Sequence, residues 1–221
     1  MPQSMRRIIR NRLLHSLILV AIIYLVGIVS VIAGRAEGLM QLTVYNLIFA
    51  MAVLLYNAES IDFRYWIWFM VCAIAGFTLE VIGVQTALIF GEYSYGNILG
   101  AAGWGVPYII GLNWSFLVFA SAALVHHLKI TIVARAAIAA TIMVLYDIFL
   151  EPVAIHYGFW EWGAGPVPLQ NYLAWWIIAF FMLLGAFRFV PVLRNKVGVY
   201  LLGIQTLFFI IIIIKQGLPI H

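Results

Sequence analysis

The chain has 221 residues, of which 66% are hydrophobic and only 9% charged, and its formal net charge is +4 at pH 7. This composition excludes an ordinary water-soluble domain and is typical of an integral membrane protein. Basic loops that face anionic lipid account for the positive balance, so it gives no argument for a nucleic-acid partner.

Seven apolar runs approach the ~20 residues that a helix needs to cross the hydrocarbon core of a bilayer. In chain order they cover residues 13–32, 39–56, 66–90, 106–125, 132–150, 173–190 and 197–214. The first is too long for the apolar segment of an ordinary signal peptide, so we expect it to remain as a helix. Because the connections are short, residues 1–221 are predicted to form one all-α, polytopic membrane helical bundle of about seven transmembrane helices.

Lysine and arginine residues divide unevenly between the two sides of this predicted bundle. If the N-terminus is inside, ten basic residues face inward and only Arg35 and Lys215 face outward. The inner ten are Arg6, Arg7, Arg10, Arg12, Arg64, Lys129, Arg135, Arg188, Arg194 and Lys196. The positive-inside rule therefore predicts a cytoplasmic N-terminus and an external C-terminus. The expected location is the plasma (inner) membrane of a prokaryote.

Two of the apolar runs contain a carboxylic acid that is followed by the same motif. Eleven residues after Glu80, and again eleven after Asp147, begins the pattern glycine, any residue, aromatic, any residue, aromatic, glycine, at 91–96 and 158–163. A Val-Pro pair and an asparagine follow both copies, at 106–107 with Asn113 and at 167–168 with Asn171. Ionisable groups inside a bilayer are costly, so an intramembrane acid indicates a functional site.

The two copies predict a parallel tandem repeat, residues 66–125 and 132–190. Glu80 lies 14 residues past Trp66 and Asp147 lies 15 residues past Ile132. At 1.5 Å per residue, both acids lie ~21 Å from the inner ends of their helices, in the outer half of the bilayer. Such repeats place a site at their interface. The fifth run can continue past Pro152 as a kinked helix, which would put Glu151 on the same face as Asp147.

Tryptophans gather in the outer half of the predicted bundle. Trp175 and Trp176 are expected to be ordinary anchors at the membrane interface. An interfacial belt does not explain aromatic residues that alternate between glycines beside acids, so the two motifs are predicted to line the site. The five histidines are scattered and Cys72 is the only cysteine, so we expect no metal and no cofactor.

Two stretches of the chain resemble the CruF-type carotenoid biosynthesis membrane proteins. The first covers residues 76–114, with Gly76-Phe77-Thr78-Leu79-Glu80, the motif 90–96 and Gly105-Val106-Pro107. The second covers residues 147–176, with Asp147, Glu151-Pro152, the motif 159–162 and residues 167–172. The resemblance implies a carotenoid 1,2-hydratase, a hydro-lyase that adds water across the terminal double bond of an acyclic ψ-end group. It implies a lycopene- or γ-carotene-like substrate that enters from the bilayer, with membrane lipid and other carotenoid enzymes as candidate partners.

Hydration of this alkene requires an acid that protonates C2 and a water molecule that captures the tertiary cation at C1. Burial raises the pKa of a carboxyl group, and two neighbouring carboxyls resist ionising together. We therefore expect Glu80 and Asp147 to share a proton across the repeat interface, with Glu151 nearby. Aromatic faces can stabilise the cation, with Tyr93, Tyr95, Trp160, Trp162, Trp104 and Trp114 as candidates. Asn113 and Asn171 are expected to orient water, and Glu92, Glu161 and His156 to lie at the rim.

Two alternatives remain open at this level. A lycopene-type cyclase also begins by protonating a polyene, but it ends by losing a proton. A proton-coupled transporter could use the same carboxylates without chemistry. Both acids lie toward one side of the bilayer, and no file of polar residues leads from them to the inner face, which disfavours transport.

Overall fold

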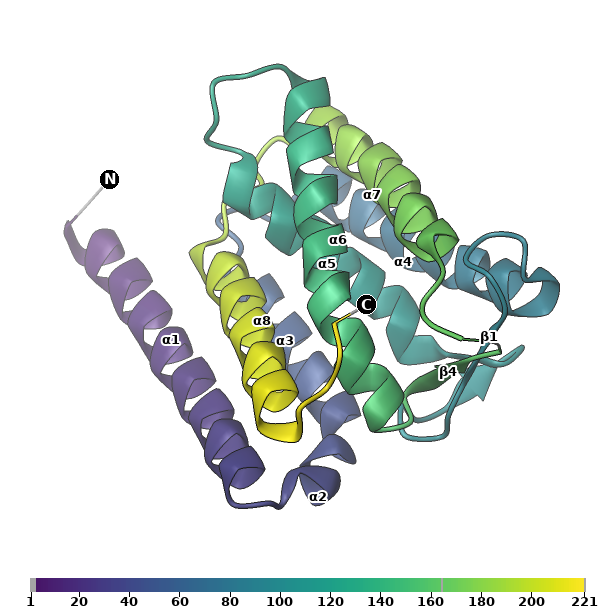
Figure 1. The fold of residues 1–221 in the computed structure, drawn as a ribbon. Helices are drawn as coiled ribbons and strands as arrows, with labels where there is room; N and C mark the ends of the chain where they lie inside the picture. The colour runs from purple at the N-terminus through teal and green to yellow at the C-terminus, as the bar shows by residue number, and fades with distance from the viewer. Residues whose placement is uncertain (1–2, 164, 221) are drawn as a thin grey trace.

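The computed structural model describes residues 3–163 and 165–220, with side chains from residue 11 onward. Its main elements are helices (Figure 1), so the predicted all-α membrane bundle is confirmed. In chain order they are α1 (Gln3–Ile32), α2 (Ala36–Met40), α3 (Thr43–Asn57), α4 (Phe63–Thr86), α5 (Tyr108–Val125), α6 (Ile132–His156), α7 (Leu169–Phe189) and α8 (Lys196–Gln216). Short strands lie between them: β1 (Tyr93–Tyr95), β2 (Ala102–Gly103), β3 (Val106–Pro107) and β4 (Trp160–Trp162).

Within the described residues, six helices are long and apolar enough to cross a membrane: α1, α4, α5, α6, α7 and α8. The predicted second run, 39–56, differs from this pattern because a turn at Gln41 and Leu42 divides it into α2 and α3. At 1.5 Å per residue, the 15 residues of α3 extend ~22 Å, less than the ~30 Å hydrocarbon core. Residues 3–163 and 165–220 therefore form six span-length helices and the shorter apolar helix α3, with the five-residue α2 before it.

Helix α5 forms the centre of the bundle. Its membrane-length window is 78% buried, whereas the corresponding windows of the other five span-length helices are 28–44% buried. It packs against α4, α6 and α8, and also contacts α3 and α7. Helix α1 lies at one edge of the molecule (Figure 1), packs chiefly against α8, and exposes apolar side chains such as Leu25 and Val29. In a bilayer these exposed apolar faces meet lipid.

Helices α4 and α6 both begin with a side-chain cap, and they carry Glu80 and Asp147 at similar distances from their first residues. The Asp62 carboxylate accepts from the Tyr65 N–H (2.9 Å), and the Thr131 hydroxyl accepts from the Ala134 N–H (3.1 Å). Helix α6 continues through Pro152 to His156. Glu151 therefore lies one turn beyond Asp147, and both carboxyl groups are buried.

The two repeated motifs pair with each other, which the sequence analysis did not anticipate. β1 and β4 form an antiparallel ladder in which Tyr93 faces Trp162, Ser94 faces Glu161 and Tyr95 faces Trp160. Backbone hydrogen bonds from the Gly96 N–H to the Phe159 carbonyl (2.9 Å) and from the Gly163 N–H to the Glu92 carbonyl (2.8 Å) extend this ladder. Exchanging the two copies maps the ladder onto itself, so a local two-fold axis passes through the Ser94–Glu161 pair. The period-two alternation of the aromatics was the available signal for strands.

Gly96 is required where the two copies meet. A Cβ at this position would lie 2.1 Å from the Gly158 carbonyl oxygen, a backbone atom that cannot move aside without separating β1 from β4. We expect Gly96→Ala to lower the thermal midpoint of the detergent-solubilised protein by several degrees, because the extended ladder is lost. The control is Gly203→Ala in α8, where an added Cβ meets nothing within 4 Å. Equal midpoints for the two variants would contradict the required close approach.

Candidate functional site

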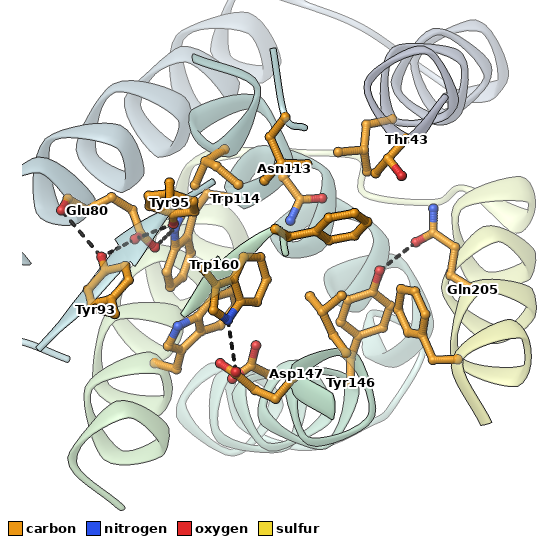
Figure 2. Close-up of a pocket in the computed structure, with 18 of the residues that line it drawn as sticks. Thr43, Glu80, Tyr93, Tyr95, Asn113, Trp114, Tyr146, Asp147, Trp160 and Gln205 are labelled. Carbon is orange, nitrogen blue, oxygen red and sulfur yellow. Dashed lines mark hydrogen bonds between the residues drawn. The ribbon is translucent and has the colours of Figure 1, made fainter. Parts of the chain in front are cut away.

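A cavity of about 100 Å³ lies inside the bundle, lined by the strand pair β1–β4 and by residues of helices α1 to α8. Glu80, Asp147 and Glu151 all line it, and their exposed fractions are 3%, 1% and 2%. Figure 2 shows Glu80 on one side of this space, Asp147 on another, and Trp160 between them. The space exceeds the ~10–15 Å³ that one water molecule requires. The structure thus gathers the three predicted acids around one cavity.

Glu80 is held by three donors. Its Oε2 accepts from the hydroxyls of Tyr93 (2.5 Å) and Tyr95 (2.8 Å), and its Oε1 accepts from Trp114 Nε1 (3.0 Å). Alternate residues of a strand point to the same face, which is why both tyrosines of β1 reach the same carboxylate. Burial, and next the charge of Glu80, raise the pKa of the Tyr93 and Tyr95 hydroxyls, so both remain protonated donors.

Glu151 is held in the same way by the second motif. Its Oε2 accepts from Trp160 Nε1 (2.9 Å) and Trp162 Nε1 (3.1 Å), both on β4. The Asn171 amide nitrogen donates to Glu151 Oε1 (3.4 Å) and to Asp147 Oδ2 (3.2 Å), so it bridges these two acids. Asp147 Oδ1 is buried and has no hydrogen-bond partner among the described residues.

The hydrogen bonds pair the acids differently from the sequence repeat. The repeat aligns Glu80 with Asp147, yet the aromatic donors of the second strand bind Glu151, one helical turn further along α6. In the described part of the chain, no hydrogen bond joins Glu80 to Asp147, and Asp147 is instead linked to Glu151 through Asn171. This difference in pairing follows from the shapes of the side chains. The Nε1 donor of a tryptophan and the hydroxyl donor of a tyrosine lie at different distances and directions from equivalent backbone positions.

Trp175 belongs to the site, although the sequence analysis assigned it to the membrane interface. It lines the cavity and stacks on Trp114, with ring centroids 4.2 Å apart and an interplanar angle of 26°. A sequence signal existed: Trp175 follows Trp114 by 61 residues, the same interval that separates Val167 from Val106. Trp114 and Trp175 are therefore equivalent positions of the two copies.

The other predicted site residues divide into two groups. Asn113 lines the cavity, and its buried Oδ1 has no partner among the described residues. Trp104 lies away from the cavity, with 72% of its surface exposed, and its carbonyl accepts from Gln85 Nε2 (3.1 Å). The three predicted rim residues are exposed: Glu92, Glu161 and His156.

Five further polar residues line the cavity toward α1, α3 and α8: Tyr24, Thr43, Asn46, Tyr146 and Gln205. The Tyr146 hydroxyl donates to Gln205 Oε1 (2.9 Å), and Asn46 Nδ2 donates to the Tyr24 hydroxyl (2.9 Å). Sequence reasoning missed them because it followed the two intramembrane acids and the motifs that repeat after them. Asn46 and Gln205 lie within apolar runs, and that position was the signal that could have found them.

Metal binding has no candidate set within residues 3–163 and 165–220, where no group of three or more His, Cys, Asp or Glu side chains is placed to hold an ion. The fold and the cavity define a polytopic membrane protein with a carboxylate-lined internal site. The chain belongs to the carotenoid biosynthesis protein family, whose model matches residues 41–217.

One relative of this chain carries a more specific name. The chain is 29% identical over 177 residues to the bisanhydrobacterioruberin hydratase of Haloarcula japonica. This match covers 71% of the present chain but only 59% of the relative. No solved structure matches the chain.

The neighbours Trp175 and Trp176 provide a matched test of this geometry. Trp175 stacks on Trp114, whereas Trp176 stacks on Phe180 and donates to the Thr141 hydroxyl (3.1 Å). We expect Trp175→Leu to change the near-ultraviolet circular dichroism strongly and to lower the thermal midpoint more than Trp176→Leu does, because only the first removes a support of Trp114 and thus of Glu80. Equal effects of the two substitutions would return Trp175 to the role of an interface anchor.

Proposed function

We propose that this protein is a carotenoid hydratase, a hydro-lyase that adds water across the terminal C1=C2 double bond of an acyclic ψ-end group. Membership of the carotenoid biosynthesis family and the name of the Haloarcula japonica relative support the substrate class and the reaction class. The observation that carries the proposal is the set of three buried carboxyl groups around one aromatic-lined cavity.

Asp147 is the proposed proton donor. Both oxygens of Glu151 accept hydrogen bonds, Oε2 from the indoles of Trp160 and Trp162 and Oε1 from the amide of Asn171, so Glu151 is proposed to be the ionised partner. Asp147 Oδ1 has no such donor, and it is therefore the oxygen that can carry a proton into the cavity. A general acid of this kind contributes ~10²–10⁴-fold to the rate.

Glu80 is the proposed counter-charge. Three donors converge on it, which suits a carboxylate. Protonation of C2 leaves a positive charge on C1, and a fixed carboxylate across a water-poor cavity stabilises this charge. The faces of Tyr95 and Trp160 add to this stabilisation.

Water is proposed to bind beside Asn113. The Asn113 Oδ1 is a buried acceptor without a donor among the described residues, and a water molecule supplies such a donor. The water oxygen forms a bond to C1, and its surplus proton passes to the pair Asp147–Glu151, which thereby regains the proton that Asp147 donated to C2. The product is the tertiary alcohol, and the reaction is redox-neutral.

The proposed arrangement in the membrane follows the distribution of basic residues. The N-terminus faces the cytoplasm, the C-terminus faces outward, and the cavity lies in the outer half of a prokaryotic plasma membrane. Apolar side chains cover the outside of the bundle, so a carotenoid reaches the cavity from the lipid and needs no route through water.

Expression in a lycopene-accumulating host tests the reaction. We expect pigments heavier than lycopene by one or two water molecules, because each ψ-end group can be hydrated once. Mass spectrometry of the extracted pigments measures this gain. An isomer of unchanged mass would instead identify a cyclase, and unchanged lycopene would remove the hydratase proposal.

Paired carboxyl substitutions test the assigned roles. We expect Asp147→Asn to lower the rate at least ~10²-fold, and Asp147→Asn with Glu151→Gln to be hardly worse, because residues that act as a unit are not additive. The fold-losses in rate of Glu80→Gln and Asp147→Asn should multiply in the double variant, since the two residues act separately. Glu161→Gln, an exposed site, is the control and should retain full activity. A wild-type rate for Asp147→Asn would remove Asp147 as the donor.

A further inference from the structure

A second cavity of about 440 Å³ lies between α1, the α2–α3 segment and α8. Its walls are almost entirely apolar, formed by side chains such as Ile22, Val26, Leu39 and Phe49. We call this space the α1–α3 groove. No catalytic group of the proposed reaction lies in it, so it calls for a separate explanation.

The α1–α3 groove adjoins the acid cavity, the space of about 100 Å³ that Glu80, Asp147 and Glu151 line. Five residues line both spaces: Tyr24, Met40, Thr43, Asn46 and Phe208. Tyr24 lies with its ring edge-on to Phe208, with centroids 5.9 Å apart, and receives a hydrogen bond from Asn46. Figure 2 shows Thr43 on the side of the acid cavity opposite Glu80. The boundary therefore carries a few polar groups, and beyond it the lining is apolar.

We propose that the α1–α3 groove binds the polyene chain of the carotenoid whose end group occupies the acid cavity. This inference rests on the proposed hydratase function and extends it to substrate length. A carotenoid is far longer than its end group, so most of the chain must lie outside a cavity of about 100 Å³. The groove adjoins that cavity, is about four times as large, and offers the apolar surface that a polyene would bury.

Gly27 keeps the groove open. It lies on α1 and lines the groove, and a Cβ there would come within 3.1 Å of Phe208 Cε2 and 3.6 Å of Leu39 Cδ2. A larger side chain at this position must occupy the groove or push Phe208 toward the acid cavity. Val26 also lines the groove, whereas Val29 does not, although their exposed fractions are nearly equal at 57% and 56%. The pair provides a matched control.

The test measures binding and turnover separately in the full chain. Binding of lycopene is measured by quenching of tryptophan fluorescence in the Asp147→Asn protein, where the expected slow turnover leaves the substrate intact during the measurement. We expect Gly27→Leu in this background to raise the lycopene Kd about tenfold. In the active protein, Gly27→Leu and Val26→Trp should lower kcat/KM for lycopene by a similar factor. Neither should change kcat/KM for a short isoprenoid that carries the same terminal alkene, and Val29→Trp should change nothing.

Three results would overturn the inference. The first is an unchanged lycopene Kd in the Gly27→Leu protein. The second is an equal loss of kcat/KM for lycopene and for the short isoprenoid. The third is a phospholipid that remains bound in the groove, detected by native mass spectrometry, while lycopene binding is unaffected. Failure of the hydratase proposal is distinguishable, because wild-type protein would then bind lycopene in a Gly27-dependent way without adding water to it.

Discussion

The pairing of β1 with β4 is the interaction on which the site depends. A carboxyl group buried in a hydrocarbon-surrounded bundle requires donors, since an unpaired buried charge is strongly destabilising. The strand pair supplies four: Tyr93 and Tyr95 for Glu80, and Trp160 and Trp162 for Glu151. Because each strand is short, its register is held by the glycines at its ends, where Gly96 and Gly163 continue the ladder.

The two halves of the repeat share a plan and differ in chemistry. In each, a helix carries an acid and the strand that follows returns two aromatic donors to it. The first half uses the phenols of its strand, together with the Trp114 indole, so that both oxygens of a single glutamate accept hydrogen bonds. The second half uses indoles, which leave Asp147 beside Glu151 with one oxygen unpaired. In the proposed mechanism this difference gives the acids different roles. A carboxylate whose two oxygens both accept hydrogen bonds supplies negative charge, and a carboxyl group with one unpaired oxygen supplies a proton.

Helices outside the repeat complete the cavity. Helices α1, α3 and α8 close one side with Tyr24, Asn46 and Gln205, and the α1–α3 groove lies beyond them. The repeat alone would leave this side open to lipid. In the proposed enzyme, the repeat therefore binds the reacting end group, and helices α1, α3 and α8 bind the rest of the substrate.

The amino-acid sequence by itself determined the membrane class, most of the spans and the acids of the site. These depend on composition, run length and the high cost of intramembrane charge, all of which are local properties of the chain. The sequence left open whether α6 continues through Pro152, and the structure shows that it does, which gives Asp147 and Glu151 a shared face.

Only the tertiary structure decided which groups meet. Each of these meetings joins residues from different elements. They are the pairing of the two motifs and the hydrogen bonds of Trp160 and Trp162 to Glu151. The stacking of Trp114 on Trp175 and the position of Trp104 outside the cavity also belong here. A repeat in sequence predicts equivalent backbone positions. It does not predict which carboxylate a donor reaches, because side chains of different length and shape on equivalent backbones end at different places.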